Sequence, residues 1–137
     1  MQQQEFNAAS MALFDGDRFL LIRRARSPFL DHWSLPGGRR ERGETALQCA
    51  IREAGEETGL SVFSADPVTV LNVGQGRPFH LAVFASRDFE GELTGSDEIS
   101  AYGWFSETDL PNLLTTPELP EVIVMAKRVV AHDFSRL

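Results

Sequence analysis

One amphipathic segment constrains the fold more than any other part of the chain. Residues 45–58 carry apolar side chains at helical spacing, and Gly59 follows where a helix commonly ends on a glycine. The loop signal Pro36-Gly37-Gly38 precedes the segment, and strand-like apolar runs lie before and after it. A chain of 137 residues suits one compact domain. We therefore expect residues 1–137 to form a single domain in which this helix covers a sheet. The apolar stripe of the helix consists of Leu47, Ala50, Ile51 and Ala54.

Strand signals flank the helix on both sides. Two apolar runs, Ser10–Phe14 and Arg18–Arg24, surround Asp15-Gly16-Asp17 and predict a β-hairpin. Residues 27–36 show no such pattern and are expected to be irregular. The order of strands, helix, strands and helix predicts an α/β (α+β) domain. The remaining expected elements are strands over 68–73, 79–86 and 102–105, a strand or turn over 89–94, a helical turn over 107–110 and a helix over 120–132.

Charge and composition argue against several classes of protein. The formal net charge is −7 and no Lys/Arg-rich block is present, which disfavours binding of DNA or RNA. Cys49 is the only cysteine, so no disulfide can form within the chain. No apolar run approaches the ~20 residues that span a bilayer, and the first residues lack the pattern of a signal peptide. We expect a cytoplasmic protein that binds a small molecule, without a nucleic acid polymer or a membrane as partner.

Three glutamates of the expected helix share one stripe. Glu53, Glu56 and Glu57 stand at positions i, i+3 and i+4, next to the apolar face. Like charges at this spacing destabilise a helix, and a hard divalent cation such as Mg²⁺ or Mn²⁺ would offset the repulsion. Arg52 is an additional local counter-charge. Taken alone, such a triplet is more often a solvated acidic surface than a metal site.

A longer pattern favours the metal site. It resembles the signature of the Nudix (MutT-type) hydrolase family, and all seven fixed positions of that signature match. At ordinary residue frequencies, a chance match is on the order of one in 10⁸ per start position. Ala54 is smaller than the aliphatic residue that the family usually has there. The likeness continues in residues 20–24, 33–38 and 96–105. The matching positions are Gly38, Glu44, Arg52, Glu53, Glu56, Glu57 and Gly59.

The resemblance implies the fold of the family, a mixed central β-sheet sandwiched between helices. It also implies a metal-dependent hydrolase. By position, Glu53, Glu56 and Glu57 would bind Mg²⁺, with Mn²⁺ as the alternative. The backbone carbonyl of Gly38 would add a ligand, and Arg52 would orient and partly neutralise the carboxylates.

Further residues complete the site that the resemblance implies. Glu44 would brace the loop behind the metal ligands, because it projects away from the other three glutamates on a helical wheel. Glu53 is the first candidate for the general base and Glu98 the second. Arg24 is a candidate for substrate binding through a base or phosphate. Arg39 directly follows the glycines and could meet a phosphate, although a solvent-exposed arginine is the commoner case.

Members of this family hydrolyse a nucleoside diphosphate linked to another moiety. For this chain, ADP-ribose or a nucleotide sugar is the first expected substrate class. A MutT-like nucleoside triphosphate pyrophosphohydrolase is the main alternative, and a dinucleoside polyphosphate hydrolase is the third. A non-catalytic nucleotide-binding sensor module is the alternative of another class, which the intact set of glutamates disfavours. The sequence leaves open whether the protein is a monomer or a homodimer.

Overall fold

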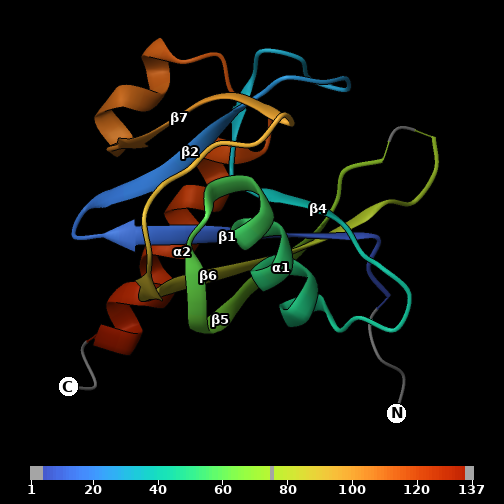
Figure 1. The fold of residues 1–137 in the computed structure, drawn as a ribbon, viewed down its shortest axis with the longest axis horizontal. Coiled ribbons are helices and arrows are strands. Elements are labelled where there is room, and N and C mark those ends of the chain that lie inside the picture. Colours follow the sequence, from blue (N-terminus) through green and yellow to red (C-terminus); the bar gives the residue numbers. More distant parts are fainter. Residues whose placement is uncertain (1–4, 75, 135–137) are drawn as a thin grey trace.

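A mixed sheet forms the centre of the protein (Figure 1). The structure is a computed structural model that describes residues 5–74 and 76–134. Within these residues, seven strands form the sheet, and two α-helices and one 3₁₀ helix pack around it. In chain order the elements are β1 (Ala8–Asp15), β2 (Arg18–Arg24), β3 (Trp33–Ser34), β4 (Gly37–Arg39), α1 (Ala46–Thr58), β5 (Ser61–Asn72), β6 (His80–Glu90), β7 (Ile99–Phe105), the 3₁₀ helix η1 (Glu107–Asn112) and α2 (Leu119–Phe134).

Strand β1 lies at the centre of the order β3-β2-β1-β6-β5. It runs parallel to β6, whereas the pairs β1–β2, β1–β4, β2–β3, β2–β7 and β5–β6 are antiparallel. One edge of β1 is divided between two partners. Residues 8–10 pair with β4, and Phe14 and Asp15 pair with β2. Strands β2 and β4 therefore pair with different parts of the same edge of β1.

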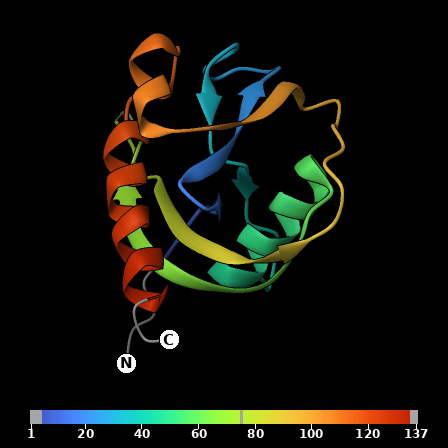
Figure 2. The same ribbon diagram turned by 90° about the vertical axis from the view of Figure 1, so that its left-hand side faces the viewer.

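Alternate side chains of β1 serve two separate hydrophobic cores. Ala9, Met11 and Leu13 belong to the core beneath α1, whereas Ala12 and Phe14 belong to the core beneath α2. Figure 2 shows the result: α2 covers one face of the sheet, and α1 lies against the opposite face. This arrangement confirms the predicted mixed sheet between helices.

The N-terminal hairpin is confirmed as well. Phe14 pairs with Phe19 and Asp15 pairs with Arg18, which leaves Gly16 and the next residue as a two-residue loop. Gly16 has a φ of 61°, a left-handed conformation that glycine adopts without strain. None of the helices in the described ranges is long and apolar enough to cross a membrane.

Strand β5 is much longer than the strand predicted over residues 68–73, because it begins at Ser61. Its pairing with β6 slips at three places between Val62 and Thr69. Such bulges interrupt the alternation of polar and apolar side chains, so periodicity does not reveal the first half of the strand. Strand β6 extends to Glu90, so the segment 89–94 is a strand end followed by a bend and not a separate strand.

The segment expected to be irregular contributes a short strand, and the adjoining loop signal contributes another. β3 lies within residues 27–36 and pairs with β2, and β4 occupies the glycines where a loop was expected. Neither strand has an apolar alternation of its own. Both exist because a longer neighbouring strand offers free backbone groups for pairing.

Candidate active site

Helix α1 is capped at both ends. The Thr45 side chain accepts a hydrogen bond from the Gln48 amide at 3.1 Å, and the Gln48 side chain accepts one from the Thr45 amide at 2.9 Å. This capping box starts the helix. Gly59 ends it with a φ of 81°, and its amide donates to the Gly55 carbonyl at 2.9 Å. The predicted helix is therefore confirmed, and the helix that carries the glutamates is hydrogen-bonded at both of its ends.

Two of the three glutamates lie on the buried face of α1. Glu53 is 7% exposed and Glu57 is 4% exposed, whereas Glu56 points toward solvent. Leu47 and Ile51, which were predicted to belong to the buried stripe, are only half-buried. The buried face of α1 includes Glu53 and Glu57 in place of Leu47 and Ile51. Its other buried residues are small, so the helix lies close to the sheet along this face. These small buried residues are Cys49, Ala50 and Ala54.

Strand β4 makes room for the buried carboxylates. A side chain at Gly38 would overlap the Glu53 carboxylate. The Gly37 amide donates a hydrogen bond to Glu57 Oε1 at 2.7 Å. The carbonyl of Gly38, which we expected to be a metal ligand, accepts a hydrogen bond from the Cys49 thiol at 3.6 Å. Gly38 thus leaves space for Glu53, whereas the backbone amide of Gly37 binds Glu57.

Arg52 binds three glutamates of the signature at once. Its Nε donates to Glu44 Oε2 at 2.6 Å and its Nη2 to Glu44 Oε1 at 3.0 Å, a bidentate pair. Its Nη1 donates to Glu53 Oε1 at 2.7 Å and to Glu56 Oε2 at 3.2 Å. Its Nη2 also donates to the Arg39 carbonyl at 2.9 Å. The guanidinium thus ties the helix to β4 and to the loop between them.

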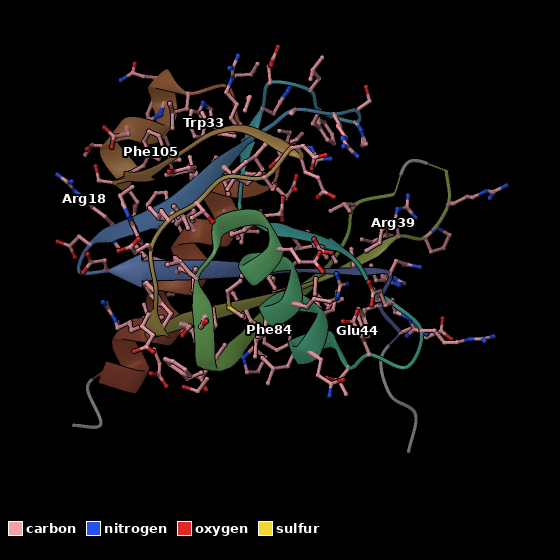
Figure 3. All side chains as sticks on the ribbon, in the orientation of Figure 1. Arg18, Trp33, Arg39, Glu44, Phe84 and Phe105 are labelled. Atoms are coloured by element: carbon pink, nitrogen blue, oxygen red, sulfur yellow. The ribbon has the colours of Figure 1, made fainter. Side chains whose placement is uncertain are left out.

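Glu44 does not project away from the other glutamates, as a helical wheel suggested. It lies in the loop before α1, so a helical projection does not apply to it (Figure 3). It shares Arg52 with Glu53 and Glu56, and its Oε1 accepts a hydrogen bond from the Glu41 amide at 2.6 Å. These contacts fix the loop between β4 and α1.

Burial and pairing shift the pKa values of these carboxyls in opposite directions. The hydrogen bond from Arg52 lowers the pKa of Glu44 to about 2. Burial raises the pKa of Glu57 to about 8, although the Gly37 amide acts against the shift. Burial also raises the pKa of Glu53, and Arg52 opposes that shift. The two buried carboxyls therefore hold protons more tightly than free glutamates do.

Two charged residues from distant parts of the chain act on the buried carboxyls. Glu98, just before β7, raises the pKa of both Glu53 and Glu57 by electrostatic repulsion. Arg24, near the end of β2, lowers the pKa of Glu57. The fold thus brings these two sequence-predicted residues into the electrostatic neighbourhood of the helix. Arg23 instead forms an ion pair with an exposed aspartate.

A cleft of about 1120 Å³ is lined partly by β4. Arg24, Arg39 and Arg77 contribute positive charge to its lining. The Arg39 guanidinium lies over the Phe79 ring, 5.1 Å from its centroid. Figure 3 shows Arg39 beside the loop that joins β5 to β6. The apolar part of the lining includes Leu35, Leu81, Val83, Leu119 and Val122.

Comparison with known families agrees with this geometry. Residues 5–125 match the NUDIX domain. The chain belongs to the NUDIX domain family. The matched range contains the whole signature from Gly38 to Gly59, so the resemblance inferred from the sequence is confirmed.

Relatives of this Nudix chain include a phosphatase. It is 34% identical over 119 residues to the 8-oxo-dGDP phosphatase NUDT18 of Homo sapiens, a match that covers 83% of this chain and 36% of that protein. The chain thus spans about a third of the length of this curated relative.

Solved Nudix structures share the fold. The MutT NUDIX hydrolase from Burkholderia pseudomallei has a TM-score of 0.80 and 27% identity, with 89% of this chain and 98% of that chain covered. An ADP-ribose pyrophosphatase from Streptococcus suis 89-1591 has a TM-score of 0.75 and 27% identity, with 90% of each chain covered. The predicted fold class is confirmed by these likenesses.

The donor set around α1 fits the divalent cation that the Nudix signature implies. Carboxylate and backbone carbonyl oxygens are the ligands that Mg²⁺ and Mn²⁺ prefer. In the described residues the three carboxylates do not converge on one point. Arg52 holds Glu53 and Glu56, and Gly37 holds Glu57. Side-chain rotations at these glutamates would be needed to surround an ion.

Sequence reasoning missed the residues that shape the cleft. Phe79 and Arg77 come from the β5–β6 connection, and Ser10 comes from β1. Their separation along the chain hides their proximity to β4. Ser10 offers one weak signal, because it is polar within the apolar run of β1. Buried polar side chains normally have a hydrogen-bond partner, so a serine in this run indicates a polar contact.

Proposed function

We propose that this Nudix domain hydrolyses a diphosphate bond in a nucleoside diphosphate linked to another moiety, in a metal-dependent reaction. One observation carries the proposal. Glu53 and Glu57 are buried beside a strand of glycines, and the same strand lines a cleft that contains Arg24 and Arg39. Burial of two neighbouring carboxylates is unfavourable without a compensating cation. A cation is also needed for an anionic substrate to bind beside these carboxylates, because the protein has a net charge of −7.

Glu53, Glu56 and Glu57 would hold Mg²⁺, or alternatively Mn²⁺. When bound, such ions neutralise phosphate oxygens and lower the pKa of an attacking water. The carbonyl of Gly37 is better placed than that of Gly38 to assist, because the amide and carbonyl of one strand residue point to the same edge. Arg52 would keep the carboxylates in position, and Glu44 would hold Arg52.

Glu53 remains our first candidate for the general base and Glu98 the second. Burial raises the pKa of Glu53 toward the range in which a base works best at neutral pH. Glu98 is exposed and lies just before β7. We expect Glu53→Gln to remove the acidic limb of the pH profile of kcat/KM and Glu98→Gln to retain it. The opposite result would assign the base to Glu98.

Arg24 is proposed to bind a phosphate or the base of the substrate, and Arg39 is proposed to bind a phosphate. Both line the cleft, and Arg39 is held over Phe79. The likeness to an ADP-ribose pyrophosphatase supports ADP-ribose or a nucleotide sugar as the first substrate class. The likeness to a MutT hydrolase and to an 8-oxo-dGDP phosphatase supports a MutT-like reaction on nucleoside di- or triphosphates as the alternative.

The central test replaces Glu57 by Gln, which keeps the size of the side chain and removes its charge. Parent and variant are assayed with Mg²⁺ for release of nucleoside monophosphate from ADP-ribose, 8-oxo-dGDP, 8-oxo-dGTP and diadenosine polyphosphates. We expect Glu57→Gln to lose at least about tenfold in kcat/KM on the substrates that the parent cleaves, in line with weakened metal binding. Glu90→Gln, on the exposed end of β6, is the matched control.

Two outcomes would contradict the proposal. Equal rates for Glu57→Gln and the parent on every cleaved substrate would show that the catalytic site lies elsewhere. Tight binding of ADP-ribose by the parent without any turnover across the panel would favour the non-catalytic sensor module instead.

A further inference from the structure

Ser10 is a buried polar residue that the proposed chemistry does not use. It is 5% exposed and lies near the middle of β1, among apolar neighbours. Among the residues whose side chains the structure describes, 5–74 and 76–131, its Oγ is the only buried side-chain oxygen or nitrogen that lacks a hydrogen-bond partner. An unpartnered buried hydroxyl is unfavourable for folding, so its presence points to a partner that arrives from outside the chain.

Ser10 belongs to the lining of the cleft. Ser10 stands directly opposite Gly37 in the β1–β4 pairing, and both residues line the cleft. Gly37 keeps this place open, because a Cβ there would lie 2.7 Å from Ser10 Cβ. Val83 pairs with Ser10 across β1 and β6, and the cleft lining also includes the apolar residues Leu35 and Val122.

The chemistry of this part of the cleft suits a flat heteroaromatic ring. Ligand sites commonly combine apolar walls with a few placed polar groups, and a nucleobase has two apolar faces and a polar edge. A sugar carries hydroxyls in most directions and would leave several of them unpaired against these walls. A serine hydroxyl can both donate and accept, so it can pair with either kind of group on a base edge.

The position of Ser10 also fits the direction of a bound nucleotide. The amide of Gly37, its partner in the strand pair, donates to Glu57. Gly37 is therefore a neighbour of both Ser10 and the Glu57 carboxylate. Arg24 and Arg39 line the same cleft and carry the charge that phosphates require.

We propose that Ser10 is a specificity-determining residue whose hydroxyl binds the polar edge of the substrate's nucleobase in this cleft. The inference rests on the proposed function for the identity of the substrate class. It adds a residue and a location that the signature does not contain.

The test uses equilibrium binding, which needs no turnover. Calorimetry with Mg²⁺ present compares AMP and 8-oxo-dGMP with ribose 5-phosphate, which lacks a base. We expect Ser10→Ala to weaken binding of the preferred nucleotide about tenfold, the usual effect of one hydrogen bond, and to leave ribose 5-phosphate unchanged. Ser10→Cys keeps the size of the residue with a weaker donor and should lose affinity too.

A matched control lies on β6, outside the lining of the cleft. Ser86 is also buried, but its Oγ donates to the Ser64 carbonyl at 2.6 Å. Ser86→Ala should retain nucleotide affinity within about twofold. Thermal unfolding supplies a second readout. Ser10→Ala should melt at the same temperature as the parent or higher, because it removes a hydroxyl that has no partner in the folded protein.

Three results would overturn the inference: unchanged nucleotide affinity in Ser10→Ala, equal loss for ribose 5-phosphate, or no binding of either nucleotide by the parent. The proposed function can fail separately. A parent that binds AMP through Ser10 but hydrolyses nothing would refute the hydrolase and leave the role of Ser10 intact.

Discussion

Arg52 is the residue that links the acidic side chains of the signature to one another. It makes a bidentate contact with Glu44 and single contacts with Glu53 and Glu56. These hydrogen bonds raise the pKa of the guanidinium, so the side chain stays charged at every accessible pH. A point charge could not make the same set of contacts, because only a planar fork has donors in the required directions.

Arg52→Lys should therefore be damaging although it conserves charge. Loss of the bidentate contact should lower the free energy of unfolding by about 1.5–3 kcal/mol, the value of a hydrogen bond to a charged group. Hydrolysis should fall at least about tenfold. Urea unfolding and steady-state kinetics measure both effects. Arg40→Lys, at an exposed arginine that stacks on Phe6, is the control and should change neither. Parent-like behaviour of Arg52→Lys would show that the charge alone suffices.

The raised pKa of Glu57 makes the stability of the metal-free protein depend on pH. A carboxyl with a pKa of about 8 in the folded chain and an ordinary value in the unfolded chain favours folding while it is protonated. That contribution is complete below the ordinary value near pH 4.5 and is lost as the pH rises toward 8. Melting temperatures in EDTA should thus fall more steeply between pH 5 and 8.5 for the parent than for Glu57→Gln. Parallel curves would mean that Glu57 ionises normally.

At the scale of elements, α1 and β4 form one unit. The helix presents small residues and two carboxylates to the sheet, and Gly38 of the strand has no side chain that would compete with Glu53 for the space. The caps at Thr45 and Gly59 set the length of the helix. The glycine within α1 and the glycine that ends the helix adopt different backbone conformations. Gly59 needs its left-handed conformation, whereas Gly55 has an ordinary helical one.

Gly55→Ala should stabilise the protein. A Cβ at Gly55 would lie 3.6 Å from the Leu60 carbonyl, an ordinary contact, and alanine favours a helix over glycine by about 1 kcal/mol. We expect a gain of about 0.5–1 kcal/mol in the free energy of unfolding. Gly59→Ala is the opposing control. It should destabilise, because its positive φ and its contact with Thr94 leave no room for a side chain. A loss of stability in Gly55→Ala would reveal a tighter contact than the structure contains.

At the scale of the whole molecule, one sheet separates two cores and carries the site at the edge of one of them. Strand β1 serves both cores and pairs with β4, so the position of the site depends on the packing of both helices. The excess of acidic residues gives the chain a net charge of −7 and acts against the approach of phosphates. A cation bound at α1 would offset the negative charge at the site and favour the binding of phosphates there.

Mg²⁺ should accordingly stabilise the folded protein. A ligand that binds only the folded state adds about 2.7 kcal/mol at a concentration of 100 times its Kd. The melting temperature should rise with Mg²⁺ concentration and return to its starting value with EDTA. NaCl at equal ionic strength is the control for screening, and Glu53→Gln should reduce the response. A melting temperature that is indifferent to Mg²⁺ would contradict a metal site on α1.

The helix between Thr45 and Gly59, the hairpin around Gly16 and the family could be predicted from the sequence, because each depends on local spacing and local turn chemistry. The shared helix of the glutamates was predictable in the same way. The sequence did not predict which glutamates are buried, that Glu44 shares Arg52 with them, or that the Gly37 amide binds Glu57. These relations depend on how β4 pairs with β1 and how closely α1 approaches the sheet. The bulged half of β5 and the unpartnered Ser10 were hidden for the same reason: pairing and burial join residues that are far apart along the chain.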